Sequence, residues 1–182
     1  MKVRPAKNSG EVVMEINRRD EPLLNEATTA PFRMKKILVP VDFSECSKKA
    51  LQYAIPLAQQ HLAELQLLYV SPSPSYSGGE YGVIDYSTLN AELCASGEKR
   101  LETFVRDEIA GKVQVDTMVR SGSVTAEILD VAKTLPADII VISTHGYSGL
   151  KHVLLGSVAE HVVRHAPCPV LVVREKEHEF VS

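Results

Sequence analysis

The sequence predicts an α/β fold in which helices cover both faces of a doubly wound, five-stranded parallel sheet. Three observations support this prediction. Short unbroken apolar runs, such as residues 139–142 (IIVI), are typical of strands buried on both faces. Segments with helical character separate these runs, and such alternation is the pattern of parallel sheets. The chain of 182 residues is also long enough for one domain with a sizeable core.

The first half of the expected domain contains two strands and one long helix. Residues 35–42 (KKILVPVD) read as the first core strand running into a loop. Ser44 is a candidate N-cap for a helix that runs to about Leu62. Pro56 lies inside this helical pattern, and because proline removes a backbone donor we expect it to kink or split the helix. Residues 65–70 (LQLLYV) form the second predicted strand.

A long connection follows the second strand. Residues 71–82 are rich in serine, proline and glycine, and a loop of this length is commonly either functional or disordered. The sequence then predicts a long helix over residues 88–109, with Gly97 as a weak point in its middle. Residues 113–119 form the third predicted strand, and residues 122–134 contain the helix that follows it.

The last part of the chain supplies the fourth strand and the two elements after it. Ser157 and Glu160 have the spacing of a capping box, which predicts that the Ser157 side chain caps a helix. This helix should end near Ala166, because prolines follow directly. Residues 169–173 (PVLVV) read as the fifth strand, again short and apolar.

Composition and charge narrow the possible functions. A net charge of −3 and a pI near 6.1 give no basic surface for nucleic acid or for a membrane. No apolar run approaches the roughly 18 residues of a membrane span, and the N-terminus lacks the pattern of a secretory signal. Cys46, Cys94 and Cys168 are scattered and form no C-x-x-C motif, which favours a reducing cytoplasm as the location.

Residues 1–33 differ from the rest of the chain, because they mix charges of both signs with several prolines. Residues 10–16 (GEVVMEI) have the pattern of one short strand, which alone buries too little apolar surface to fold. Two interpretations remain: a mobile tail, or an added strand on a sheet edge or a partner subunit. We expect the domain proper to span residues 34–176, followed by a short tail, residues 177–182.

A polar, glycine-containing loop follows the fourth strand. Residues 143–149 (STHGYSG) form this loop, and Gly156-Ser157 stands at the start of the last helix. A strand, a glycine loop and a helix start together favour phosphate binding. Glycine lets the backbone approach an anion closely, and the unpaired amides at the helix start attract it. The alternative is that Gly146 and Gly149 serve only to turn the chain.

The spacing of this loop resembles the G-x2-G-x9-G-[ST] motif of the universal stress protein family. Gly146, Gly156 and Ser157 are in register with the motif, whereas Ser143 replaces its first glycine. A side chain at position 143 either crowds the ribose or adds a hydrogen bond, and positive φ there would cost about 1 kcal/mol or more. The resemblance extends over residues 34–174. It implies an adenine nucleotide alpha hydrolase-like fold with strand order 3-2-1-4-5.

The resemblance also implies that ATP binds beyond the carboxyl ends of the strands, with Mg²⁺ or Mn²⁺ held mainly by its phosphates and water rather than by protein ligands. Asp42 would bond the ribose, although its carboxylate is equally suited to capping the next turn. Pro40 and Val70 would flank the adenine, and the Val70 backbone would recognise the edge of the adenine ring. The implied ATP-binding residues are Pro40, Val41, Asp42, Val70, Ser143, His145, Gly146, Ser148, Gly149, Gly156, Ser157 and Val158.

These inferences predict an ATP-binding, nucleotide-dependent regulator in the stress response, acting on a downstream protein partner. The resemblance implies a homodimer paired through residues 169–173, an apolar edge that suits cover by a second chain. No catalytic residue is predicted, and any ATP hydrolysis should be slow, because residues 143–149 contain no lysine or arginine. Two alternatives remain: a nucleotide-free dimeric scaffold, and a slow ATP-hydrolysing or transfer enzyme.

Overall fold

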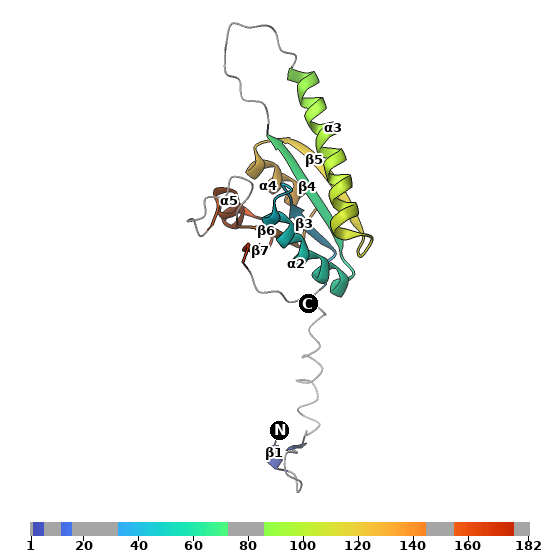
Figure 1. The fold of residues 1–182 in the computed structure, drawn as a ribbon. Helices are drawn as coiled ribbons and strands as arrows, with labels where there is room; N and C mark the ends of the chain where they lie inside the picture. Colours follow the sequence, from blue (N-terminus) through green and yellow to red (C-terminus); the bar gives the residue numbers. More distant parts are fainter. Residues whose placement is uncertain (1, 6–11, 16–32, 73–85, 145–154, 177–182) are drawn as a thin grey trace. The chain divides into compact units, whose positions relative to one another are not determined.

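A five-stranded parallel sheet forms the framework of the larger of two units in the chain (Figure 1). The two units are Met1–Arg33 and Met34–Ser182. The structure is a computed structural model, and it describes residues 2–5, 12–15, 33–72, 86–144 and 155–176. The strands of the sheet are β3 (Lys36–Pro40), β4 (Glu64–Pro72), β5 (Val115–Gly122), β6 (Ile139–Ser143) and β7 (Val170–Val173).

The strand order in this sheet is β5-β4-β3-β6-β7, and every neighbouring pair is parallel. From β3 the chain moves outward through β4 to β5, and then returns to the other side of β3 with β6 and β7. The order therefore reverses between β3 and β6. This topology confirms the predicted doubly wound α/β fold with strand order 3-2-1-4-5.

The helices lie at the predicted positions. They are α2 (Glu45–His61), α3 (Tyr86–Phe104), the π-helical turn η1 (Val105–Ile109), α4 (Val124–Thr134) and α5 (Ser157–His165). The end of the predicted helix 88–109 is thus π-helical rather than α-helical, and the Ala110 N–H donates to the Val105 carbonyl (3.2 Å), five residues earlier. Ile109, at the end of this wider turn, is fully buried in the core.

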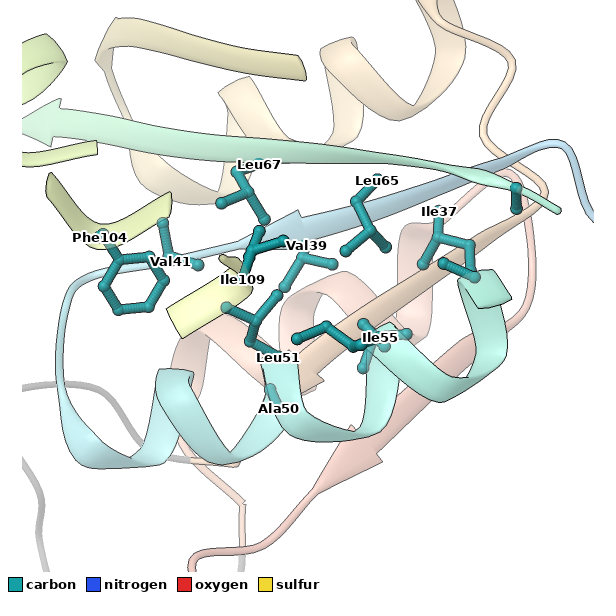
Figure 2. Packing of buried hydrophobic residues seen from close by; sticks show 14 of the residues in the cluster. Ile37, Val39, Val41, Ala50, Leu51, Ile55, Leu65, Leu67, Phe104 and Ile109 are labelled. Atoms are coloured by element: carbon teal, nitrogen blue, oxygen red, sulfur yellow. The ribbon is translucent and has the colours of Figure 1, made fainter. Parts of the chain in front are cut away.

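Two apolar clusters cover opposite faces of the sheet, because successive side chains along a strand point to opposite faces. Ile37 and Val39 of β3 belong to the first cluster, which also contains residues of α2 and α3 (Figure 2). Leu38, between them, belongs to the second cluster, with residues of α4 and α5. Burial on both faces explains why these strands are continuous apolar runs in the sequence. Each such side chain contributes about 1.5–3 kcal/mol to folding.

Two helix-disfavouring residues lie inside helices without ending them. Helix α2 is continuous through Pro56, so of the two expected effects of this proline, a kink or a split, the split is wrong and the kink stays a prediction. Gln52, four residues earlier, is exposed, so solvent can satisfy the carbonyl that has lost its amide donor. In α3, Gly97 is buried against β4, and a Cβ there would lie 2.8 Å from Cδ1 of Tyr69. Gly97 therefore allows the helix to approach the strand closely.

The smaller unit contains two strands, β1 (Lys2–Pro5) and β2 (Val12–Glu15), which pair in antiparallel orientation. Strand β2 coincides with the strand expected at residues 10–16. Its described partner is β1, and the two strands form a two-stranded sheet.

Candidate functional site

The carboxyl ends of β3 and β6 lie side by side where the strand order reverses. Open α/β sheets bind their ligands in the crevice beyond this point. The fold brings three described segments to this end of the sheet: residues 40–42 after β3, residues 70–72 at the end of β4, and residues 143–144 at the end of β6. A hydrogen bond joins the last of these segments to the start of α5.

Asp42 is half-buried, and a local network holds its carboxylate. Its Oδ1 accepts hydrogen bonds from the Ser44 N–H (3.0 Å) and from the Ser44 hydroxyl (2.5 Å). The Ser44 Oγ in turn accepts from the Ser47 N–H (3.2 Å), which confirms Ser44 as the N-cap of α2. Asp42 thus does support the next turn. A carboxylate has about four acceptor positions, so this role is compatible with binding a ligand as well.

Pro40, Val41 and Val70 are buried at this end of the sheet. The Val41 N–H donates to the Leu68 carbonyl (2.9 Å), which continues the β3–β4 pairing beyond the last residue of β3. Strand β4 runs to Pro72, two residues past its predicted end, so Val70 lies within the strand and packs in the second cluster. Contacts of Pro40 and Val70 with an adenine ring stay a prediction.

Ser143 is the last residue of β6 and is buried, with 9% of its surface exposed. It pairs in register with Val173 of β7, in ordinary strand conformation. Three described non-glycine residues have positive φ, and Ser143 is not one of them. The strain that a serine at this motif position would suffer with positive φ is therefore absent. Serine at the first position of the motif therefore does not distort the backbone at residue 143.

Thr144, which the sequence did not single out, connects three elements. Its N–H donates to the Val173 carbonyl (2.9 Å), and its carbonyl accepts from the Gly156 N–H (2.8 Å). The two ends of the segment 145–154 are therefore joined at the mouth of β6. Four predicted site residues lie in this segment, outside the described residues: His145, Gly146, Ser148 and Gly149. Their contacts with phosphate stay a prediction.

The start of α5 differs from the predicted capping box. The N-cap is Gly156, one residue before Ser157, and it makes no side-chain cap hydrogen bond. Glu160 does not cap the helix, because its Oε1 accepts from Arg164 Nη2 at 2.9 Å, one turn later. The capping-box prediction is therefore wrong. First-turn amides without a side-chain cap, at the positive end of a helix dipole, favour an anion.

The other two predicted residues of this helix start have different environments. Ser157 is exposed, whereas Val158 is half-buried and packs against the second apolar cluster. Any ligand contact of Val158 therefore involves its backbone amide more readily than its side chain. Ser157 presents both a hydroxyl and an amide at the helix start.

One titratable group near the site has a perturbed pKa. Cys46 lies in the first turn of α2, and burial is the largest factor that raises the pKa of its thiol. The carboxylates of Glu175, Asp42 and Glu45 raise it further. The thiol is therefore neutral near pH 7, which disfavours it as a nucleophile.

The described surface also contains a groove of about 350 Å³. It is lined by Glu45, Lys48, Lys49, Gln52, Glu108 and Glu175. None of the predicted site residues is among them. The Lys48 Nζ lies 2.7 Å from Glu45 Oε1 and 3.6 Å from Glu108 Oε1, so its charge is already balanced. We therefore locate the candidate site at the carboxyl ends of the strands and not in this groove.

Two further properties concern only the described part of the chain. There, no cluster of three or more histidine, cysteine, aspartate or glutamate side chains is arranged to hold a metal ion. None of its helices combines the length and the apolar character needed to cross a membrane.

Comparisons with known proteins agree with the resemblance seen in the motif. The family model described as "universal stress protein family" matches residues 34–174. A universal stress protein of Methanocaldococcus jannaschii is 35% identical over 146 residues, which are 80% of this chain and 85% of the relative.

Solved structures show the same similarity. The universal stress protein UspA from Lactobacillus plantarum is 31% identical, with a TM-score of 0.68 over 79% of this chain and 99% of that chain. A universal stress protein family protein from Arabidopsis thaliana, solved with AMP bound, shares the fold at 23% identity, with a TM-score of 0.54. That comparison covers 77% of this chain and 91% of the Arabidopsis chain.

Proposed function

The chain belongs to the universal stress protein family, and from this premise we propose that it binds ATP at the carboxyl ends of β3, β4 and β6. In this proposal Mg²⁺ or Mn²⁺ accompanies the nucleotide and is held mainly by phosphate oxygens and water. The protein acts as a nucleotide-dependent regulator in the cytoplasm. ATP occupancy changes the surface around residues 145–154, and a partner protein recognises that change.

The start of α5 is the observation that carries this proposal. Gly156 places its amide 2.8 Å from the Thr144 carbonyl, so the helix begins directly beside the end of β6. Its first-turn amides have no side-chain cap, and phosphate oxygens are suitable acceptors for them. The Ser157 hydroxyl is exposed at the same place and supplies a further donor.

The carboxylate of Asp42 is suited to the sugar of the same ligand. Ser44 fixes the carboxylate from one side, which reduces the entropy lost when a ribose hydroxyl binds to it. Pro40 and Val70 are the proposed neighbours of the adenine. The Arabidopsis relative was solved with an adenine nucleotide, AMP, which is consistent with a nucleotide as the ligand of this fold.

Regulation is favoured over catalysis by the chemistry of the loop. Residues 143–149 contain neither lysine nor arginine, the groups that usually stabilise a transferring phosphoryl. We also propose a homodimer through β7, which lies at one edge of the sheet and has a half-buried, apolar sequence. The same edge pairing would place two nucleotide sites in one assembly.

Thermal denaturation with and without MgATP tests the binding proposal. A ligand at one hundred times its Kd adds about 2.7 kcal/mol of stability, and mass spectrometry of nucleotide released from the purified protein identifies it independently. Replacing Gly146 and Gly156 together by valine should abolish both signals. Asp116→Ala, which removes an exposed carboxylate on β5, is the control. A wild-type protein that releases no nucleotide and gains no stability from MgATP would refute the proposal.

A further inference from the structure

The residue that follows Asp42 has a strained backbone. Phe43 has a φ of 67°, in the left-handed region where a residue with a side chain is strained. Such a conformation persists when the surrounding structure fixes it. The contacts of the Phe43 side chain show what fixes it here.

Three side chains from two elements surround the Phe43 ring. Tyr69 of β4 lies 4.8 Å from it, and Phe104 of α3 lies edge-on at 5.6 Å, both measured between ring centroids. The guanidinium carbon of Arg100, also on α3, lies over the ring, 4.1 Å from its centroid. We call Tyr69, Phe104 and Arg100 the Phe43 cage.

The packing of α3 on β4 places Arg100 over the ring. Gly97 lies one turn before Arg100 on the same helix, and its missing side chain allows the helix to contact the Tyr69 ring. The Arg100 guanidinium carbon also lies 5.8 Å from the Tyr69 ring centroid. The cation therefore approaches both rings from a helix backbone that the strand holds in place.

The conformation of Phe43 directs its two neighbours toward each other. Ser44, after the turn, donates both its N–H and its hydroxyl to Asp42 Oδ1, before the turn. A change of φ at Phe43 would separate these groups and release the carboxylate. We propose that Arg100 is a positioning residue for the Asp42 carboxylate, acting through Phe43 and Ser44 on recognition of the ribose. This inference rests on the proposed role of Asp42 in nucleotide binding.

The test compares ATP with 2′,3′-dideoxy-ATP, which lacks the ribose hydroxyls that Asp42 would bind. The Kd for dideoxy-ATP divided by the Kd for ATP measures how much the contact between the carboxylate and the ribose contributes. Arg100→Ala should lower this ratio about two- to fivefold, which corresponds to the free energy of an exposed cation–π contact. The affinity for dideoxy-ATP should not change, whereas a general loss of folded structure would weaken both ligands equally.

Two further arginine variants control this measurement. Arg100→Lys keeps a cation near the ring but loses the planar guanidinium. Its ratio of Kd values should therefore lie between that of Arg100→Ala and that of the wild type. Arg106→Ala removes an arginine of η1 whose side chain is 72% exposed and pairs with Asp107. It should leave the ratio at its wild-type value, because Arg106 is not part of the Phe43 cage.

Asp42→Ala separates failure of this inference from failure of the proposed function. If Asp42→Ala removes the preference for ATP and Arg100→Ala leaves it intact, the positioning role is overturned while the proposed function stands. If the wild-type protein shows no such preference, or Asp42→Ala does not alter it, the role of Asp42 is wrong and the inference is overturned with it.

Amide hydrogen exchange gives a second readout that needs no nucleotide. The Ser44 N–H is protected by its bond to Asp42, so Arg100→Ala should raise its exchange rate about two- to fivefold. The Ile140 N–H, which donates to the Pro169 carbonyl at 3.0 Å, should exchange at its wild-type rate. Equal exchange of Ser44 in Arg100→Ala and Arg106→Ala would contradict the proposal.

Discussion

The two ends of the sheet use an aspartate in different ways. At the amino ends of the strands, Asp138 Oδ2 accepts from the Lys35 N–H (2.6 Å) and the Lys36 N–H (2.9 Å), which lie 103 and 102 residues away in the sequence. At the carboxyl ends, Asp42 accepts two hydrogen bonds from Ser44, two residues away. The first carboxylate joins distant parts of the fold, whereas the second is oriented by a local turn.

The backbone around each aspartate shows the same difference. At the amino end, the Asp138 N–H donates to the Lys36 carbonyl and the Glu64 N–H to the Lys35 carbonyl, both at 2.9 Å. At the carboxyl end, α5 begins at Gly156 without a side-chain cap. The backbone around Asp138 thus joins neighbouring strands, whereas the first turn of α5 at the other end has no side-chain cap, which leaves a place for the proposed ligand. Substitutions should cost stability at the first end and binding at the second.

The largest expected effect is that of Asp138→Ala at the amino end. Two well-formed hydrogen bonds to a carboxylate contribute about 3–6 kcal/mol together. Because the bond from Lys35 is exposed and the bond from Lys36 only partly buried, we expect the free energy of unfolding to fall by less, about 2–4 kcal/mol. Urea denaturation measures this loss. Affinity for ATP should not change, and a large loss of affinity in the folded variant would contradict the division between the two ends.

The reverse pattern is expected for Asp42→Ala at the carboxyl end. A hydrogen bond to a charged group contributes roughly 1.5–3 kcal/mol to binding, so affinity for ATP should fall by tenfold or more. The free energy of unfolding should fall by about 1 kcal/mol, because the lost bonds to Ser44 are local. Titration calorimetry and urea denaturation of the same samples check both numbers. The double variant with Asp138→Ala should show additive losses of stability.

A smaller effect is expected from Gly97→Ala, which alters the contact between α3 and β4 rather than either aspartate. The new Cβ would meet the Tyr69 ring at 2.8 Å, and overpacking of this kind costs about 1–3 kcal/mol. Alanine favours the helix over glycine by about 1 kcal/mol, which offsets part of this cost. Urea denaturation should therefore show a net loss of about 1 kcal/mol. A gain in stability would mean that α3 is free to move away from β4.

The smallest effect concerns two thiols, one at each end of the sheet. Burial raises the pKa of Cys168, with Asp138 adding to the shift, and burial also raises the pKa of Cys46 above the ordinary 9.0. The unfolded thiols therefore ionise at lower pH than the folded ones. Stability should be unaffected below pH 9 and fall as pH rises through 9 toward the folded pKa values.

Urea denaturation between pH 7 and 10 measures this fall. A variant with serine in place of both Cys46 and Cys168 should show no such fall in stability, because serine does not ionise in this pH range. Iodoacetamide should react slowly with Cys46 and Cys168 in the folded protein at pH 7.5. Fast alkylation of either thiol would contradict the direction of its pKa shift.

Most of the fold could be predicted from local patterns. The strands at 139–142 and 169–173 and the helix after Ser44 follow directly from apolar runs and capping residues. The end of β4 was missed because Ser71 and Pro72 interrupt the apolar pattern. Both nevertheless pair with β5, opposite Ser121 and Gly122. Pairing with a neighbouring strand overrides the local preference of a serine or a proline.

The site was less predictable, because its contacts join residues distant in the sequence. The position of Asp42 at a strand end and the approximate start of the last helix could be predicted from the apolar runs and the loop, whereas the ligand roles of these residues stay predictions. Thr144 acts through its backbone, so its side-chain type gave no signal beyond its place after a strand. Phe43 and Arg100 are 57 positions apart in the numbering, and only the packing of α3 on β4 brings them together.

The bond between the Gly156 N–H and the Thr144 carbonyl also has an entropic consequence. It joins the end of β6 to the N-cap of α5 within the protein itself, so the entropy of closing this loop is part of the free energy of folding and not of ligand binding. Closure entropy grows slowly with loop length, by about 0.6 kcal/mol for each doubling. A longer connection between Thr144 and Gly156 should therefore lower the stability of the fold slightly and leave the affinity for a ligand unchanged.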